Sequence, residues 1–174
     1  MKSTLTPLNY LLLALLDRKP QSGYGLCRMI EAMPIGAVSA SPGSIYPSLS
    51  KLMDSGHLLA EAYGGTVKRR KRYSLSAAGR RALKKWLRAP ISASTAIRSP
   101  EILFIKLSFA DPDSAWMVTQ MKTLSTDLGR RLDELQTYRA AGLHDMAAGG
   151  QQALDLSIQL VQLLHTWTDS FGET

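Results

Sequence analysis

The chain has 174 residues, of which 45% are hydrophobic and 20% charged, which is typical of a folded domain with or without a helical extension and not of a disordered chain. Its longest apolar run, Tyr10 to Leu16, has seven residues, whereas a membrane-spanning helix needs about 20. Charged residues stand where a signal-peptide cleavage site would lie, so we expect a cytoplasmic protein without a membrane segment. The single cysteine, Cys27, excludes an internal disulfide framework.

The net charge of +7 is unevenly distributed along the chain. Residues 1–90 hold 15 Lys or Arg against 4 Asp or Glu, a net charge of +11, whereas residues 91–174 hold 6 basic against 10 acidic residues, a net charge of −4. A basic part joined to a mildly acidic part is typical of a polyanion-binding module attached to a body with another role. Nucleic acid is therefore the first candidate partner.

Three helices are predicted in the first third of the chain, over residues 7–17, 24–33 and 41–55. The first has an N-cap at Thr6 and a proline at its first position. The third places Ile45 on an apolar face and leaves the opposite face polar. Because Pro47 lacks an N–H and is harmless only near the first turn of a helix, we expect the third helix to begin at Gly43 or Ser44.

A basic hairpin is predicted after the third helix. Two short strands, over residues 57–63 and 67–75, flank the turn signal Gly64-Gly65, and the second contains five consecutive cations, Lys68 to Arg72. Further helices are predicted over residues 77–88 and 101–109, from Asp111-Pro112 through Leu135, and over 151–171 after a break at Gly149-Gly150. The stretch between Pro90 and Pro100 is rich in Ser, Ala and Thr and is interpreted as a linker.

Three helices followed by a basic two-stranded hairpin is the element order of a winged helix-turn-helix. A short polar helix fits the major groove, about 12 Å wide, and presents hydroxyl and amino groups to base edges. The cations of the hairpin can follow phosphates or enter a narrow minor groove. We therefore expect a mainly α protein with a winged helix-turn-helix DNA-binding domain over residues 1–90, a linker over 91–99, and a long-helix dimerisation and effector-sensing region over 100–174.

Three motifs resemble the PadR family of transcriptional regulators. They are Gly23-Tyr24-Gly25, the string SPGSIYPSL from Ser41 to Leu49, and the segment from Tyr73 to Arg80. The resemblance covers roughly residues 8–90, and the part from Pro100 onward looks like the virulence-activator type of helical C-terminal half. It implies a homodimer that binds pseudo-palindromic operator DNA, most often as a repressor, with C-terminal helices exchanged between protomers. Small-molecule effectors regulate some members of the family.

Carried over by position, the resemblance assigns the residues that contact DNA. Ser41, Gly43 and Ser44 would contact phosphates at the start of the recognition helix, where free N–H groups favour an anion. Tyr46 is the strongest candidate for groove contact, because apolar neighbours already occupy the buried face. The expected DNA-binding set is Tyr24, Ser41, Gly43, Ser44, Tyr46, Pro47, Ser48, Lys51, Lys68, Arg69, Arg70 and Lys71. The cation run has a simpler alternative, a solvated loop.

The last predicted helix carries more apolar residues than one slender helical half can bury. A second copy of the chain is the economical explanation, and a monomeric helix pair packed against the N-terminal part is the alternative. The expected dimer interface consists of Leu124, Leu128, Leu135, Leu156, Leu160, Leu163, Leu164 and Trp167. Trp116 and Trp167 are candidates for an effector pocket between protomers, although large aromatic residues at helical spacing are more often core.

The sequence contains no recognisable catalytic constellation. His57, His144 and His165 are scattered, and no Gly-rich phosphate loop, paired-His motif or nucleophile elbow occurs. We therefore expect no enzyme activity, no cofactor and no metal. The predicted function is a homodimeric, sequence-specific transcriptional regulator, and the alternative is a nonspecific nucleic-acid-binding or protein-interaction module.

Overall fold

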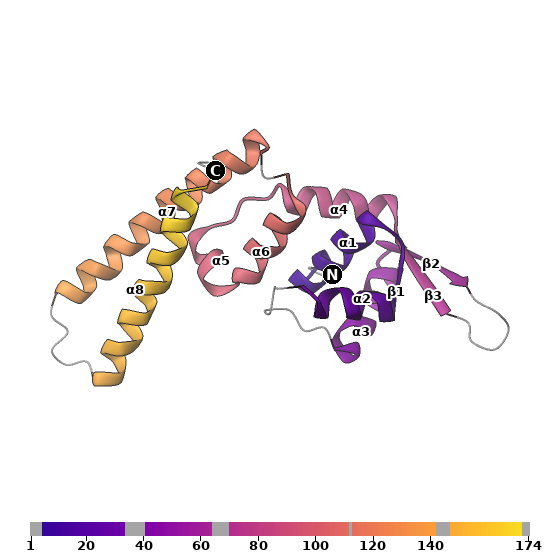
Figure 1. Ribbon diagram of the computed structural model, residues 1–174, viewed down its shortest axis with the longest axis horizontal. Coiled ribbons are helices and arrows are strands. Elements are labelled where there is room, and N and C mark those ends of the chain that lie inside the picture. The colour runs from indigo at the N-terminus through magenta and orange to yellow at the C-terminus, as the bar shows by residue number, and fades with distance from the viewer. Residues whose placement is uncertain (1–4, 34–40, 64–69, 112, 142–146, 172–174) are drawn as a thin grey trace. The chain divides into compact units, whose positions relative to one another are not determined.

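The computed structural model describes residues 5–33, 41–63, 70–111, 113–141 and 147–171 (Figure 1). These residues form, in chain order, α1 (Pro7–Arg18), β1 (Gln21–Ser22), α2 (Gly23–Glu31), α3 (Pro42–Asp54), β2 (Leu58–Tyr63), β3 (Arg70–Leu75), α4 (Ala77–Leu87), α5 (Ala93–Arg98), α6 (Pro100–Phe109), α7 (Ala115–Ala140) and α8 (Ala148–Asp169). None of these helices is long and apolar enough to cross a membrane. The mainly helical fold expected from the sequence is confirmed.

The chain divides into two compact units. The N-terminal unit contains residues 1–89 and 104–109, and the helical unit contains residues 90–103 and 110–174. The boundary therefore falls inside α6, whose last six residues belong to the N-terminal unit. Residues 91–99, interpreted as a linker, contain α5, which is capped by the Ser92 hydroxyl accepting from the Thr95 N–H at 3.2 Å.

The N-terminal unit is a winged helix-turn-helix. Its small antiparallel sheet has the strand order β1-β3-β2, with Leu58 opposite Leu75 and Tyr63 opposite Arg70. One core joins α1 to the other elements, and its fully buried side chains include Leu11, Leu12, Leu13, Leu26, Ile45, Leu49, Leu52 and Ile105. The core holds one face of α3 and the inner face of the wing, which leaves their other faces for a partner.

Capping hydroxyls and a proline at the first position mark where these helices begin, and three of the starts differ from the predicted ones. α2 begins at Gly23 because the Ser22 hydroxyl accepts from the Gly25 N–H at 3.1 Å. α3 begins at Pro42, earlier than expected, because Ser41 is extended and Pro42 fits the first position. Pro47 consequently lies inside α3. α7 begins at Ala115, after Ser114 and not at Asp111-Pro112.

The helical unit is built on α7 and α8, which lie side by side (Figure 1). Its buried side chains include Met117, Met121, Leu124 and Leu128 of α7 and Ile158 and Val161 of α8. The Ser125 hydroxyl donates to Asp169 at 3.1 Å, and Arg139 pairs with Asp155 at 3.4 Å. Gly149-Gly150, expected as a break, lies in the first turn of α8.

Two glycines allow the sharp chain reversal and close packing behind the wing. Gly56, between α3 and β2, has a φ of 71°, which residues with a Cβ rarely adopt. Gly79 brings α4 onto the backbone of His57, because a Cβ at this position would lie 2.1 Å from the His57 carbonyl oxygen.

Lys106 is a buried lysine that the sequence pattern did not reveal. Its side chain is 2% exposed, and its ammonium donates to the carbonyl oxygens of Trp86, at 2.6 Å, and of Ala89. It also lies 4.9 Å from the centre of the Trp86 ring. These acceptors lie at the C-terminal end of α4, where a cation is favoured by the helix dipole. Burial lowers the pKa of Lys106 to about 8.

We predict that Gly79→Ala destabilises the N-terminal unit by about 2 kcal/mol or more, because the added methyl group collides with backbone that has no room to move. The measurement is thermal unfolding followed by circular dichroism. Gly43→Ala is the matched control, because the nearest atom to its added Cβ is 3.9 Å away. Equal unfolding temperatures of the two variants would contradict the prediction.

We predict that Lys106 makes the free energy of unfolding depend on pH. Its pKa is about 8 in the folded chain and 10.5 ordinarily, so unfolding takes up a proton between these values. The free energy of unfolding should therefore rise with pH across that window, by about 1–3 kcal/mol after allowance for the two carbonyl bonds. Urea unfolding at a series of pH values measures this rise as the difference between the wild type and Lys106→Met. A difference that is flat or falls with pH would refute the assignment.

Candidate nucleic-acid interface

The outer face of α3 presents the polar residues predicted to contact DNA. Tyr46 is 48% exposed, and Ser41, Gly43 and Pro47 are also exposed. Ser44, Ser48 and Lys51 are half-buried. The hydroxyls of Ser41 and Ser44 form a hydrogen bond of 3.0 Å at the start of the helix. The opposite face is fixed in the core by Ile45, Leu49 and Leu52, so the rotation of α3 about its axis is determined.

A tyrosine-lined hollow of about 730 Å³ lies beside α3 in the N-terminal unit. It is formed by α2, α3 and the two wing strands, and its lining residues are Ser22, Gly23, Tyr24, Tyr46, Tyr63, Lys71 and Tyr73. Tyr24 projects into solvent, whereas Tyr73 is buried. Burial, with a smaller contribution from Tyr46, raises the pKa of Tyr73. The hollow therefore offers phenol groups and aromatic edges beside an exposed lysine.

Gly23 lets Tyr46 lie against the start of α2. A Cβ at Gly23 would lie 2.6 Å from Cε1 of Tyr46, closer than any real contact. The Tyr46 ring is thus held between α2 and solvent, and its position depends on the absence of a side chain at residue 23. This contact explains why the first residue of the Gly23-Tyr24-Gly25 motif has no side chain.

The wing adds cations beside the hollow. Lys71 and Arg72 are exposed on β3, and the Arg72 guanidinium lies 4.6 Å from the centre of the Tyr63 ring. Arg70 lies in β3, but its side chain is outside the described residues, as are Lys68 and Arg69. Tyr63 and Tyr73 were not among the DNA contacts predicted from the sequence, because only the pairing of β2 with β3 brings them beside α3.

The residues expected at a dimer interface fall into two groups in the helical unit. Leu124 and Leu128 are fully buried within this single chain. Leu135 and Leu164 are half-buried. Four large apolar side chains of α8 are exposed: Leu156, Leu160, Leu163 and Trp167. We call these four the α8 stripe.

The two tryptophans suggested for an effector pocket have ordinary packing environments. Trp167 packs on Phe171 with ring centres 5.5 Å apart, and Trp116 is half-buried on α7. Neither lines the tyrosine hollow. Among the described residues, no group of three or more His, Cys, Asp or Glu side chains could hold a metal ion.

Comparisons with known proteins identify relatives of the fold. A search of curated proteins returns no match. Among solved structures, the chain is similar to Bacillus subtilis PadR in complex with operator DNA, with 22% identity, a TM-score of 0.50 and 97% of each chain covered. It is also similar to the PadR-like transcriptional regulator BC1756 from Bacillus cereus, with 16% identity, a TM-score of 0.44, and 98% of this chain and 96% of that chain covered.

At these identities the structural likeness supports the fold alone, and the family resemblance comes from the sequence. Residues 12–85 match the model of the transcriptional regulator PadR-like family. The matched segment contains part of α1, all of α2 and α3, both wing strands and most of α4. The chain is therefore similar to the PadR-like family of transcriptional regulators over residues 12–85, which are less than half of its 174 residues.

Proposed function

We propose that this chain is a homodimeric, sequence-specific repressor that binds a pseudo-palindromic DNA operator. The observation that carries the proposal is Tyr46, which is exposed on the polar face of α3 while the opposite face is locked in the core. The similarity to Bacillus subtilis PadR, solved in complex with operator DNA, supports the same use of the winged helix.

In this proposal α3 enters the major groove and the wing contacts the flanking backbone. The Tyr46 hydroxyl hydrogen-bonds a base edge, and its ring packs against a thymine methyl group. The start of α3 at Ser41, Gly43 and Ser44 contacts a phosphate. The wing cations, Lys71 and Arg72 together with the predicted contacts Lys68, Arg69 and Arg70, supply sequence-independent affinity.

The α8 stripe supports a dimer. Its members are spaced four, three and four residues apart, so they share one helix face that is left exposed in the single chain. A two-fold dimer that reads a pseudo-palindromic operator places its two recognition helices about 34 Å apart, one turn of DNA, or a small multiple of that distance. Residues 1–90 would then read the operator and residues 100–174 would dimerise, in the cytoplasmic location expected for a DNA-binding protein.

The alternative function is nonspecific nucleic-acid binding or protein interaction. Selection of random duplex DNA by the purified chain at physiological salt, followed by sequencing, separates the two. Enrichment of an inverted repeat is expected for the operator-binding dimer. Binding without enrichment that weakens steeply with salt would favour the alternative.

We predict that Tyr46→Ala lowers affinity for the selected operator by about tenfold to a hundredfold, because it removes a base contact worth about 1–3 kcal/mol. Affinity for random duplex DNA should stay nearly unchanged. Fluorescence anisotropy with labelled duplexes measures both. Tyr138→Ala is the matched control, because Tyr138 on α7 is also 48% exposed. An equal loss on both duplexes would contradict a role in sequence recognition.

We predict that Leu160→Glu combined with Leu163→Glu converts the dimer to a monomer at micromolar concentration, because two carboxylates would be buried in an apolar interface. Sedimentation equilibrium measures the dissociation constant of the dimer, which should rise a hundredfold or more. Gln159→Glu combined with Gln162→Glu, at two exposed positions of α8, adds the same two charges outside the stripe and should leave the dimer intact. A double variant that remains dimeric would reject the α8 stripe as the interface.

A further inference from the structure

We propose that the exposed side of α4 binds a second DNA duplex, separate from the duplex that α3 and the wing contact. It carries five exposed basic residues in the N-terminal unit: Arg80, Arg81, Lys84, Lys85 and the C-cap Arg88. We call these five the α4 basic face. The joining of two duplexes rests on the proposed function, whereas DNA binding by this face does not.

The sequence places all five cations on the outward side of α4. They follow one another at alternating intervals of one and three residues, so they form two adjacent rows along the helix. The inward side is held by Leu83, which is 3% exposed, and by Trp86 and Leu87, which pack against the core. Because the apolar side is already covered, a ligand of this face must bind through charge.

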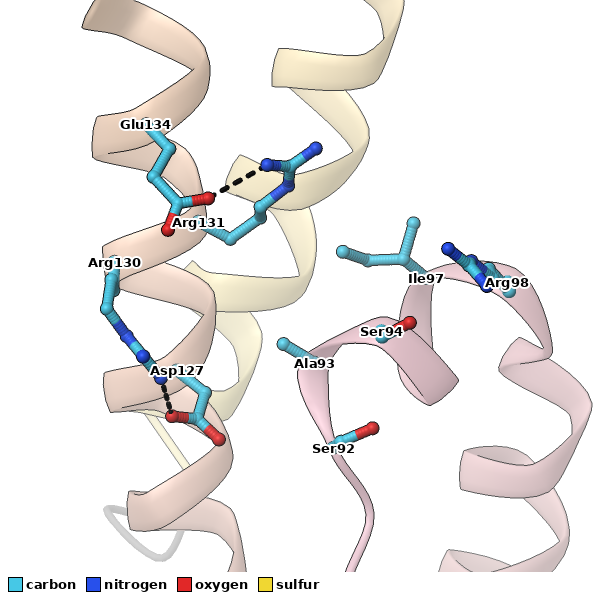
Figure 2. A pocket seen from close by; sticks show the side chains of 9 residues that line it. All are labelled: Ser92, Ala93, Ser94, Ile97, Arg98, Asp127, Arg130, Arg131 and Glu134. Carbon is cyan, nitrogen blue, oxygen red and sulfur yellow. Dashed lines mark hydrogen bonds and ion pairs between the residues drawn. The ribbon is translucent and has the colours of Figure 1, made fainter.

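Most of the charge on the α4 basic face is not neutralised within the chain. Arg80 pairs with Asp17 at the end of α1, whereas the other four cations form no ion pair with any residue that the structure describes. The exposed arginines of α7 differ, since Arg131, for example, pairs with Glu134 on the same helix at 2.8 Å (Figure 2). The sequence of α4 contains no acidic residue. Its basic face therefore remains available to an external polyanion.

The clustering of like charges is unfavourable for α4 itself. Cations four residues apart on a helix repel one another, and the two rows contain three such pairs: Arg80 with Lys84, Lys84 with Arg88, and Arg81 with Lys85. Lys84 and Lys85 lie in the last turn, where the helix dipole favours cations. The dipole does not account for Arg80 and Arg81, which lie nearer the start of the helix. A polyanion bound to this face relieves the repulsion and stabilises α4.

The α4 basic face and the recognition helix lie on different sides of the N-terminal unit. α3 packs against α1, α2 and β2, whereas α4 packs against α1 and β3. Figure 1 shows α1 between α3 and α4. A duplex at the outer face of α3 is therefore separated from α4 by the body of the unit. The five cations do not face that duplex, so they are available to a second one.

Duplex DNA fits this face better than an acidic protein does. From Arg80 to Arg88 the helix rises about 12 Å, and a duplex carries about seven negative charges over that length of its axis. The centre of a protein–protein interface is depleted of charged residues. On α4, however, every apolar side chain larger than alanine is buried or half-buried. Contacts made only to phosphates carry no sequence information, so the second duplex can have any sequence.

The test measures binding of a labelled random-sequence duplex to the full chain already saturated with a short unlabelled operator. Fluorescence anisotropy is the readout. We expect micromolar binding at low salt, and an affinity that falls about tenfold to a hundredfold between about 50 and 200 mM salt, as two to four phosphate contacts predict. A saturated complex that binds no second duplex would overturn the proposal. So would polyglutamate that competes as well as DNA, because it would identify an acidic protein as the ligand.

Two matched variants locate the second duplex on α4. Arg81→Gln combined with Lys85→Gln removes one row of the face, and glutamine keeps the helix propensity of the residues it replaces. This variant should bind the second duplex about tenfold more weakly, and the slope of log K against log salt should become shallower by about 1.8. Lys122→Gln combined with Arg139→Gln is the control, because it removes one lysine and one arginine from exposed positions of α7. Equal binding of the second duplex by the two variants would refute the α4 site.

Operator binding separates a failure of this inference from a failure of the proposed function. The Arg81 and Lys85 double variant should bind the operator with the affinity of the wild type, since neither residue belongs to α3 or the wing. If the wild type selects no operator, the two variants are compared on random duplex alone. A shallower salt slope for the α4 variant then supports the α4 basic face, although the repressor role fails. If the operator is selected but the α4 variant and the control bind the second duplex equally, the repressor role stands and the α4 site fails.

Discussion

The burial of one face of α3 is the constraint on which the interface depends. Ile45, Leu49 and Leu52 are fully buried in the core of the N-terminal unit, and this fixes the direction of every other side chain of the helix. Tyr46 follows a buried residue and therefore must point outward. Large-to-small changes at the buried positions would cost about 2–5 kcal/mol each, so the orientation of the recognition face is coupled to the stability of the unit.

Two glycines allow neighbouring elements of the N-terminal unit to approach one another closely. Without a side chain, Gly23 leaves room for the Tyr46 ring against α2, and Gly79 lets α4 lie directly on His57. The aromatic hollow between α3 and the wing thus depends on small residues as much as on its four tyrosines. Arg72, whose guanidinium lies over the ring of Tyr63, adds a positive charge to the same surface.

Periodicity predicted the longer helices and the two wing strands, because helical and strand spacing follow from which side chains are buried. It did not predict the two-residue β1 or the six-residue α5, which are too short to show a repeating pattern. The starts of α2, α3 and α7 were less predictable, because each helix is preceded by several residues that could cap it. The residue that does so, such as Ser22 or Ser114, is identified only by its hydrogen bond in the structure. The burial of Lys106 was not predicted, because lysine side chains are almost never fully buried unless they are paired. Its carbonyl partners lie 17 and 20 residues earlier in the chain, and only tertiary structure brings them together.

Tertiary structure is also needed to interpret α7. The sequence alone could not show which of its leucines pack within the chain and which are available to a partner. Leu128 is buried, whereas Asp127, Arg130 and Arg131, within one turn of it, line a hollow between α5 and α7 (Figure 2). α7 therefore carries two kinds of residue within single turns: charged residues that lie toward α5 and leucines that are buried in the helical unit. Helical periodicity alone could not separate them, because which leucines are buried depends on the packing of α8 and α5 against α7.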